Sequence, residues 1–137
     1  MLIGTKQNTK FTVMSDIRNK LLEDPEIRSI IANRIFPVTC PEEIPNGAFI
    51  VYSRDSYGID TTKQGIYQER CNVFISCVSS DYDEASMLAE KVFLCIHGYW
   101  NYKNNETGVI INQVNLNDST EDFANDKYIV TLSFEIL

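Results

Sequence analysis

The chain has 137 residues, of which 44% are hydrophobic and 11% aromatic, enough for one folded domain with its own core. Its formal net charge of −7 argues against non-specific nucleic-acid binding and against a basic membrane-binding surface, since both need clustered Lys and Arg. No stretch has the length and hydrophobicity of a membrane span, and we expect neither a signal peptide nor membrane contact.

The four cysteines stand at wide, irregular spacing without a C-x-x-C pair: Cys40, Cys71, Cys77 and Cys95. His97 is the only histidine and does not complete a common zinc-binding set with them, so no metal site is expected. Three of the cysteines lie in apolar runs, where a free thiol behaves as a small hydrophobic group. We therefore expect reduced thiols, as in a reducing cytoplasm.

Residues 1–14 form a polar arm, and residues 15–137 are expected to form the single domain. A first short helix is expected to start with Ser15 or Asp16 as its N-cap and to stop at Asp24. A second helix then starts with Pro25 in its first turn. The connector after it is rich in proline, which lacks a backbone donor and restricts the backbone, so we expect a semi-rigid surface strap that either docks on a partner or only spans a fixed gap between helix and sheet. Its candidate docking residues are Phe36, Pro37, Pro41 and Pro45.

Residues 48–53 read as the first strand, with apolar side chains on both faces. The polar segment 54–65 contains two glycines and is predicted to be a mobile loop. Four of its side chains are poorly explained as core, which makes them candidate contacts with a partner: Arg54, Tyr57, Ile59 and Lys63. The second strand, residues 66–78, alternates with Cys71, Val73, Ile75 and Cys77 on one face.

The clearest helix signal covers residues 80–98. Ser80 with Asp83, or Asp81 with Glu84, supplies a capping box, and apolar residues recur at helical spacing along one face. Gly98 is a natural stop. His97 lies in the last turn without a catalytic partner in the sequence, so a structural role is expected for it.

Residues 107–116 and 126–137 read as two more strands, separated by an acidic loop, residues 117–126. The predicted fold is one α+β domain of order α-β-β-α-β-β, in which helices pack on one face of a mainly antiparallel sheet of about four strands. The predicted core includes Val73, Ile75, Leu88, Val92, Ile96, Val130, Leu132 and Phe134.

Catalytic motifs are missing from the sequence: it has no G-x-S-x-G, no glycine-rich phosphate loop and no H-E-x-x-H. The acidic pairs Asp24/Glu26, Asp81/Asp83 and Glu121/Asp122 fall in expected loops or helix starts, where carboxylates commonly act as caps or solvated charges. We therefore expect no enzymatic activity and no cofactor.

The order of these features resembles the tail-completion, or tail terminator, proteins of long-tailed bacteriophages and prophages. The resemblance covers residues 17–98 and is carried by "LLEDPEIRSII", "NRIFP", the proline-containing strap, "AFIVYS" and "CNVFISCVSSDYDEAS" before a long helix ending in "IHGY". Tyr82 to Ala85 match the family's y-x-x-A helix start. The longer polar arm and the acidic insertion at 117–126 depart from the pattern.

The resemblance implies a ring, usually a hexamer, that caps the finished tail tube and joins it to the head. The implied partners are further copies of the chain, the tail tube protein and a head-completion protein, first in the host cytoplasm and then in the virion. Since the genome would pass through such a ring, an acidic lumen or rim would keep DNA from sticking. Candidate residues for it are Asp118, Glu121, Asp122 and Asp126. The alternatives are another neck or minor tail component, such as a head-closure adaptor, and a small-ligand module with a pocket between helix and sheet.

Overall fold

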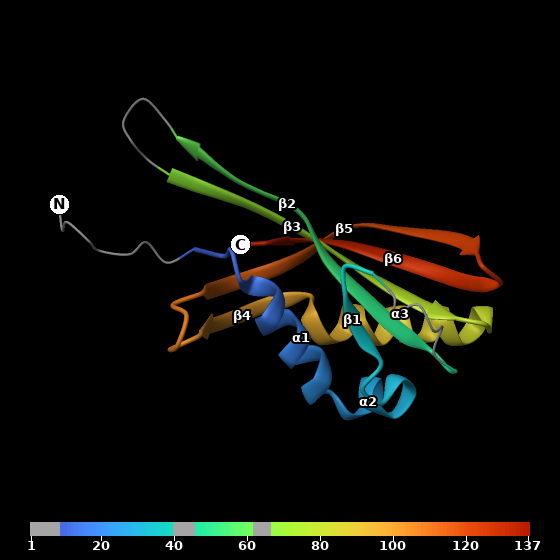
Figure 1. The fold of residues 1–137 in the computed structure, drawn as a ribbon. Helices are drawn as coiled ribbons and strands as arrows, with labels where there is room; N and C mark the ends of the chain where they lie inside the picture. The colour runs from blue at the N-terminus through green and yellow to red at the C-terminus, as the bar shows by residue number, and fades with distance from the viewer. Residues whose placement is uncertain (1–8, 40–45, 62–66) are drawn as a thin grey trace.

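The computed structural model (Figure 1) describes residues 9–39, 46–61 and 67–137. Three helices and six strands follow one another in the order α1 (Val13–Glu23), α2 (Pro25–Ile31), β1 (Ile35–Pro37), β2 (Phe49–Thr61), β3 (Tyr67–Ser79), α3 (Tyr82–Ile96), β4 (Gly98–Lys103), β5 (Ile110–Ala124) and β6 (Lys127–Ile136). The strands form one sheet in the order β1-β2-β3-β6-β5-β4, with the helices on one face.

The α+β prediction is confirmed, but its sheet of about four strands is wrong. The sheet has six strands and is mixed, because β1 runs parallel to β2 while every other neighbouring pair is antiparallel. The two strands that the sequence did not reveal, β1 and β4, are the two edge strands. The three residues of β1 are too few for an alternating pattern, and β4 follows directly on the helix.

The core lies between the sheet and the helices. All eight predicted core residues are buried, and α3 packs across β3 and β6 at the centre of the sheet. Cys71, Val73, Ile75 and Cys77 alternate along β3 and are fully buried, as predicted. The buried side chains of β3, which recur at every second residue, therefore pack against those of α3, which recur at helical spacing, in a single apolar layer.

The helix ends follow the prediction only in part. In α2, Pro25 lies in the first turn, and the Asp24 carboxylate accepts hydrogen bonds from the N–H groups of Glu26 and Ile27 at 2.9 and 3.2 Å. In α1, the predicted cap at Ser15 or Asp16 is wrong, because the helix begins at Val13 after Thr12, and Asp16 is buried inside it. The start of α1 depends on packing of Val13 rather than on a side-chain cap.

The capping box predicted at the start of α3 is also wrong. Asp81 is the N-cap residue but makes no side-chain cap bond. Instead, the Ser79 hydroxyl donates to Glu84 at 2.7 Å and accepts from the Asp81 N–H at 3.0 Å. The helix ends at Ile96, and Gly98, with a φ of +125°, starts β4. The positive φ suits glycine, as expected of a stop.

Two predicted loops are strands. Within residues 54–65, β2 continues to Thr61 and pairs with β3, which begins at Tyr67. Within 117–126, β5 continues to Ala124 and turns into β6 through Asn125 and Asp126, with φ of 53° and 60°. Asn and Asp favour such left-handed hairpin turns. The outer parts of β2 and β5 read as loops because their residues are mostly polar. In Figure 1 the β2–β3 hairpin extends beyond the helices, whereas the β5–β6 hairpin ends beside the start of α3.

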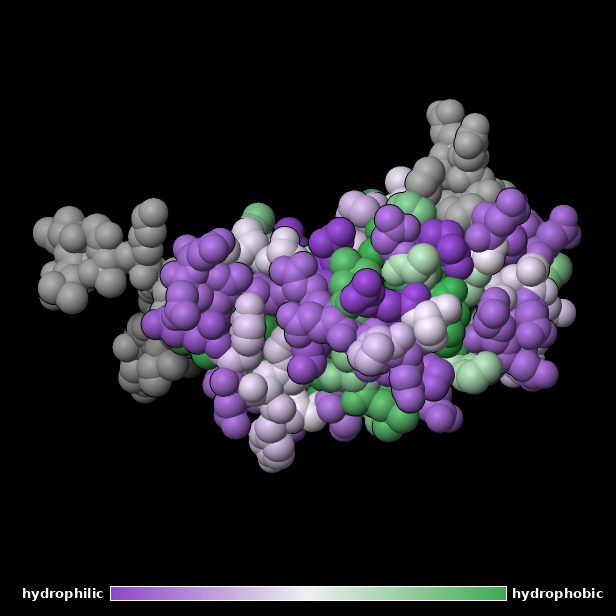
Figure 2. Space-filling model, turned by 90° about the horizontal axis from the view of Figure 1, so that it is seen from below, coloured by the Kyte–Doolittle hydropathy of each residue, from purple (hydrophilic) through white to green (hydrophobic). Residues whose placement is uncertain are grey.

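Figure 2 views the molecule from the helix side. Hydrophilic residues cover most of this face, and hydrophobic ones gather in a limited central area. The exposed apolar side chains of α3 are Met87 and Leu94. No helix in the described part of the chain is long and apolar enough to cross a membrane.

Candidate interaction surfaces

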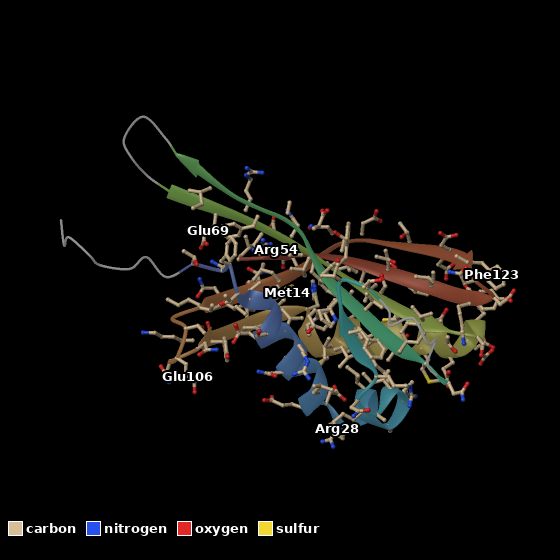
Figure 3. All side chains as sticks on the ribbon, viewed as in Figure 1. Met14, Arg28, Arg54, Glu69, Glu106 and Phe123 are labelled. Atoms are coloured by element: carbon tan, nitrogen blue, oxygen red, sulfur yellow. The ribbon has the colours of Figure 1, made fainter. Side chains whose placement is uncertain are left out.

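The first surface is a cluster along the outer half of the β2–β3 hairpin, which we call the arm clamp: Lys10, Phe11, Arg54, Tyr57 and Glu69 (Figure 3). The Glu69 carboxylate accepts from the Lys10 N–H at 2.9 Å, from the Lys10 ammonium at 3.2 Å and from the Tyr57 hydroxyl at 2.6 Å. The Arg54 guanidinium donates to the Phe11 carbonyl at 3.0 Å and lies over the Phe11 ring, 4.2 Å from its centroid. The clamp therefore fixes the start of the described chain to the hairpin.

The titration of the clamp residues reflects these contacts. Burial, together with the hydrogen bond to Glu69, raises the pKa of Tyr57 to about 12. Burial alone would raise the pKa of Glu69, but the bonds from Tyr57 and Lys10 outweigh it and lower that pKa. At neutral pH, Tyr57 is therefore a neutral donor and Glu69 a charged acceptor, the strong form of such a bond.

The predicted partner contacts Arg54 and Tyr57 thus lie in a strand and contact their own chain, which corrects the mobile-loop interpretation. Ile59 also lies in β2 and is 44% exposed, so its side chain is available to a partner. Lys63 lies outside the described residues. The sequence did not indicate the role of Lys10 and Phe11, because a polar arm carries no pattern that names its contacts.

The second surface, which we call the acidic tip, is the far end of the β5–β6 hairpin. Asp118, Glu121 and Asp122 lie in β5 and Asp126 in the turn, and all four are exposed. The Tyr82 hydroxyl, from the start of α3, donates to Glu121 at 2.7 Å. Phe123 is 54% exposed and its ring packs on Tyr128. In Figure 3, Phe123 lies at the opposite end of the molecule from Glu69.

The predicted docking strap is divided. Phe36 and Pro37 belong to β1, where Phe36 packs edge-on against Phe49 at 6.0 Å between ring centroids. They are therefore part of the sheet, which corrects their assignment to a surface strap. Val38 follows with a φ of 65° and 76% of its surface exposed. Pro41 and Pro45 lie outside the described residues.

The face of the sheet away from the helices is polar in its centre. The hydroxyls of Ser76 and Thr131 share a hydrogen bond of 3.0 Å across β3 and β6. Nearby, Asn72 donates to Ser56 at 3.2 Å and accepts from Asn117 at 3.3 Å. These hydroxyl and amide groups lie beside Glu135, which is opposite Asn72, and beside the apolar Val51 and Ile129.

A small cavity of about 200 Å³ lies between α1 and β4, lined by Asp16, Asn19, Lys20, Glu23, Cys95, His97, Tyr99, Trp100 and Tyr102. Asp16 is buried, and its Oδ1 accepts from the Tyr102 hydroxyl at 2.6 Å and from the Asn104 amide at 2.8 Å. Asp16 Oδ2 is buried without a hydrogen-bond partner among the described residues. The volume is below the 300–1,000 Å³ typical of drug-sized ligands. We assign Asp16 a structural role that joins α1 to β4.

His97 also has structural contacts. Its ring stacks on Phe93, with 4.8 Å between centroids, and its Nδ1 accepts from the Leu116 N–H at 3.1 Å. Cys71, Cys77 and Cys95 are free thiols, and burial raises the pKa of Cys71 and of Cys95 to about 11. Within residues 9–39, 46–61 and 67–137, no group of His, Cys, Asp and Glu is arranged to hold a metal ion.

Comparison with known proteins finds a likeness at the level of the fold. No protein-family model matches the chain. No curated protein matches it either. Among solved structures, the chain superposes on a chain of the virion of a native gene transfer agent particle, with a TM-score of 0.68 and 13% sequence identity. The match covers 88% of this chain and 89% of the other, so the two share most of the fold.

Proposed function

We propose that this protein is a structural component of a phage-like virion: a tail terminator that caps the completed tail tube and joins it to the head. The observation that carries the proposal is the fold shared, over nearly the full length of both chains, with a protein of a gene transfer agent virion. The sequence resemblance to tail-completion proteins supports the same role independently, because it depends on motifs and not on the superposition.

In this role the protein acts as a ring of identical subunits, most simply a hexamer, and needs neither enzymatic activity nor a cofactor. Its partners are the tail tube protein and a head-completion protein. It assembles in the bacterial cytoplasm and remains at the tail–head junction of the virion. The β2–β3 and β5–β6 hairpins project toward opposite ends of the sheet and give each subunit two separate surfaces for contacts in the assembly.

The charge distribution favours passage of DNA through such a ring. The carboxylates of the acidic tip are exposed, and the pair Ser76 and Thr131 on the helix-free face is uncharged. We propose that Asp118, Glu121, Asp122 and Asp126 line the lumen or its rim. Repeated around a ring, they would repel phosphates and prevent the release of counterions that holds DNA on basic surfaces.

The test combines size and assembly. Light scattering of the purified protein, alone and with tail tubes, should give a ring of several subunits. In a phage or prophage that encodes the chain, deleting its gene should leave filled heads and unjoined, uncapped tails of abnormal length, which electron microscopy distinguishes from intact virions. Tails of normal length that fail to join would instead indicate a head-closure adaptor. Intact virions without the gene product would refute both roles.

A further inference from the structure

The sheet has two unpaired edges at diagonally opposite corners. On one side, β1 pairs only with residues 50–52 of β2, so the outer edge of residues 53–61 has no neighbouring strand among those described. On the other side, β4 pairs with β5 only as far as Val114. The Leu116 N–H is taken by His97, so the second free edge comprises residues 117–124.

The two edges have similar lengths, and each ends at a step. The β2 edge begins where the short β1 stops, and the β5 edge begins where β4 stops. In Figure 1, the β2–β3 and β5–β6 hairpins project toward opposite ends of the sheet. The protruding β5–β6 hairpin of one copy can therefore fit into the step beside the β2–β3 hairpin of another copy.

The strand directions allow this match without turning a copy over. Neighbours are antiparallel from β2 to β3, from β3 to β6 and from β6 to β5, so β2 and β5 run in opposite directions. A second copy placed beside the first in the same orientation would present its β5 antiparallel to the first copy's β2. An antiparallel ladder is the favoured geometry for such edges.

We propose that residues 117–124 of one subunit pair with residues 53–61 of the next, so that the sheet continues from copy to copy. The inference rests on the proposed ring and names the contact that builds it. The contact is heterologous, joining two different surfaces, and such contacts close into rings when each step carries the right rotation. Every subunit would then present its helices on the same side of the continuous sheet.

The chemistry of the β5 edge opposes its pairing with itself. Asp118, Glu121 and Asp122 give it negative charge, so two β5 edges side by side would repel each other. The Asp118 and Asp122 carboxylates also accept from the next N–H groups, Ser119 and Phe123, at 2.8 and 2.7 Å. These bonds cover backbone donors in the free subunit, as is common on edge strands. The β2 edge carries Arg54 at the end that would meet Asp122 and Phe123.

Cysteine cross-linking tests the pairing. Ser56 in β2 and Thr120 in β5 are exposed, and their hydrogen-bond and register partners place both on the helix-free face. We would replace each by Cys, singly and together, in a background with Cys40 and Cys95 changed to Ser, leaving only the buried Cys71 and Cys77. Treatment with a short bis-maleimide should then join neighbouring copies, because directly opposed strand residues lie within about 5.5 Å at Cβ.

The expected result is a ladder of covalent multimers in the S56C/T120C double variant and loss of its monomer band, with neither single variant cross-linked. Cross-linking of a single variant would indicate like-with-like pairing and overturn the proposal. Light scattering on the same samples tests the edge pairing separately from the closed ring of the proposed terminator. A ring without cross-links refutes the edge pairing alone, whereas head-to-tail cross-linked open chains without a ring support the pairing and refute the closed terminator.

Discussion

The hydrogen bond from Tyr102 to Asp16 is expected to stabilise the fold strongly. Asp16 is only 4% exposed, and its charge is met by two donors, the Tyr102 hydroxyl and the Asn104 amide, both on Oδ1. Changing Tyr102 to Phe keeps the ring and removes one donor. Hydrogen bonds to charged groups contribute about 1.5–3 kcal/mol, so we expect the free energy of unfolding to fall by about that amount.

Urea unfolding can measure this loss through the fluorescence of Trp100, the only tryptophan, whose ring contacts that of Tyr102. The melting temperature should fall by roughly 5–10 °C. In an Asp16→Asn background the same change removes a bond between neutral groups and should cost only about 0.5–1.5 kcal/mol. The difference between the two losses, with Asp16 and with Asn at that position, is the coupling energy of a double-mutant cycle.

A matched control is Tyr99→Phe, since Tyr99 is 81% exposed and its hydroxyl makes no hydrogen bond to a described residue. It should change the stability by less than about 0.5 kcal/mol. If Tyr102→Phe costs as little, or costs the same with Asp16 and with Asn at that position, the carboxylate does not depend on Tyr102 and the reasoning is wrong.

Four further predictions follow from the buried layer, the tyrosines, the clamp and the acidic tip. Val92→Asp should abolish cooperative unfolding because it buries an unpaired charge, whereas Met87→Asp, on the exposed side of the same helix, should melt like the wild type. Hydrogen bonding to Asp16 raises the pKa of Tyr102 from 10.0 to about 12. The contribution of Tyr102 to the free energy of unfolding is therefore complete below pH 10 and should be lost as the pH rises to 12. In Tyr102→Phe the free energy of unfolding should fall less steeply over this range. Glu69→Ala should speed trypsin cleavage after Lys10, followed by mass spectrometry, and an unchanged rate would contradict the clamp. Changing Asp118 and Asp122 to Lys should increase the binding of duplex DNA at moderate salt and slow the ejection of the phage genome. If neither quantity changes, these residues do not act on DNA and are only surface charges.

The sequence was most informative where side chains are buried on one side only. Val73 and Ile75 are buried and alternate with partly exposed residues along β3, and Leu88 and Val92 recur at helical spacing, so strand, helix and buried faces could all be predicted. The same patterns located β6 within a residue of its observed start. Burial leaves a periodic signal because one face must leave water.

The sequence was misleading where a strand is held by its neighbours rather than by a core. The outer halves of β2 and β5 are polar, and their hydrogen bonds to β3 and β6 leave no mark in the side-chain pattern. Asp16 was mistaken for a cap because a carboxylate near a helix start usually has that role, and its partners Tyr102 and Asn104 lie far along the chain. Both errors concern contacts that depend on tertiary structure.

The position of β6 between β3 and β5 has a consequence for synthesis of the chain on the ribosome. The central pair joins β3, complete at Ser79, to β6, which begins at Lys127 near the end of the sequence. During translation, α1, α2 and the β2–β3 hairpin emerge while the side of β3 that will receive β6 still has no partner. That edge stays unpaired until β6 has left the exit tunnel, and it is the kind of surface that chaperones protect. Removal of the second half of β6 should therefore yield insoluble protein.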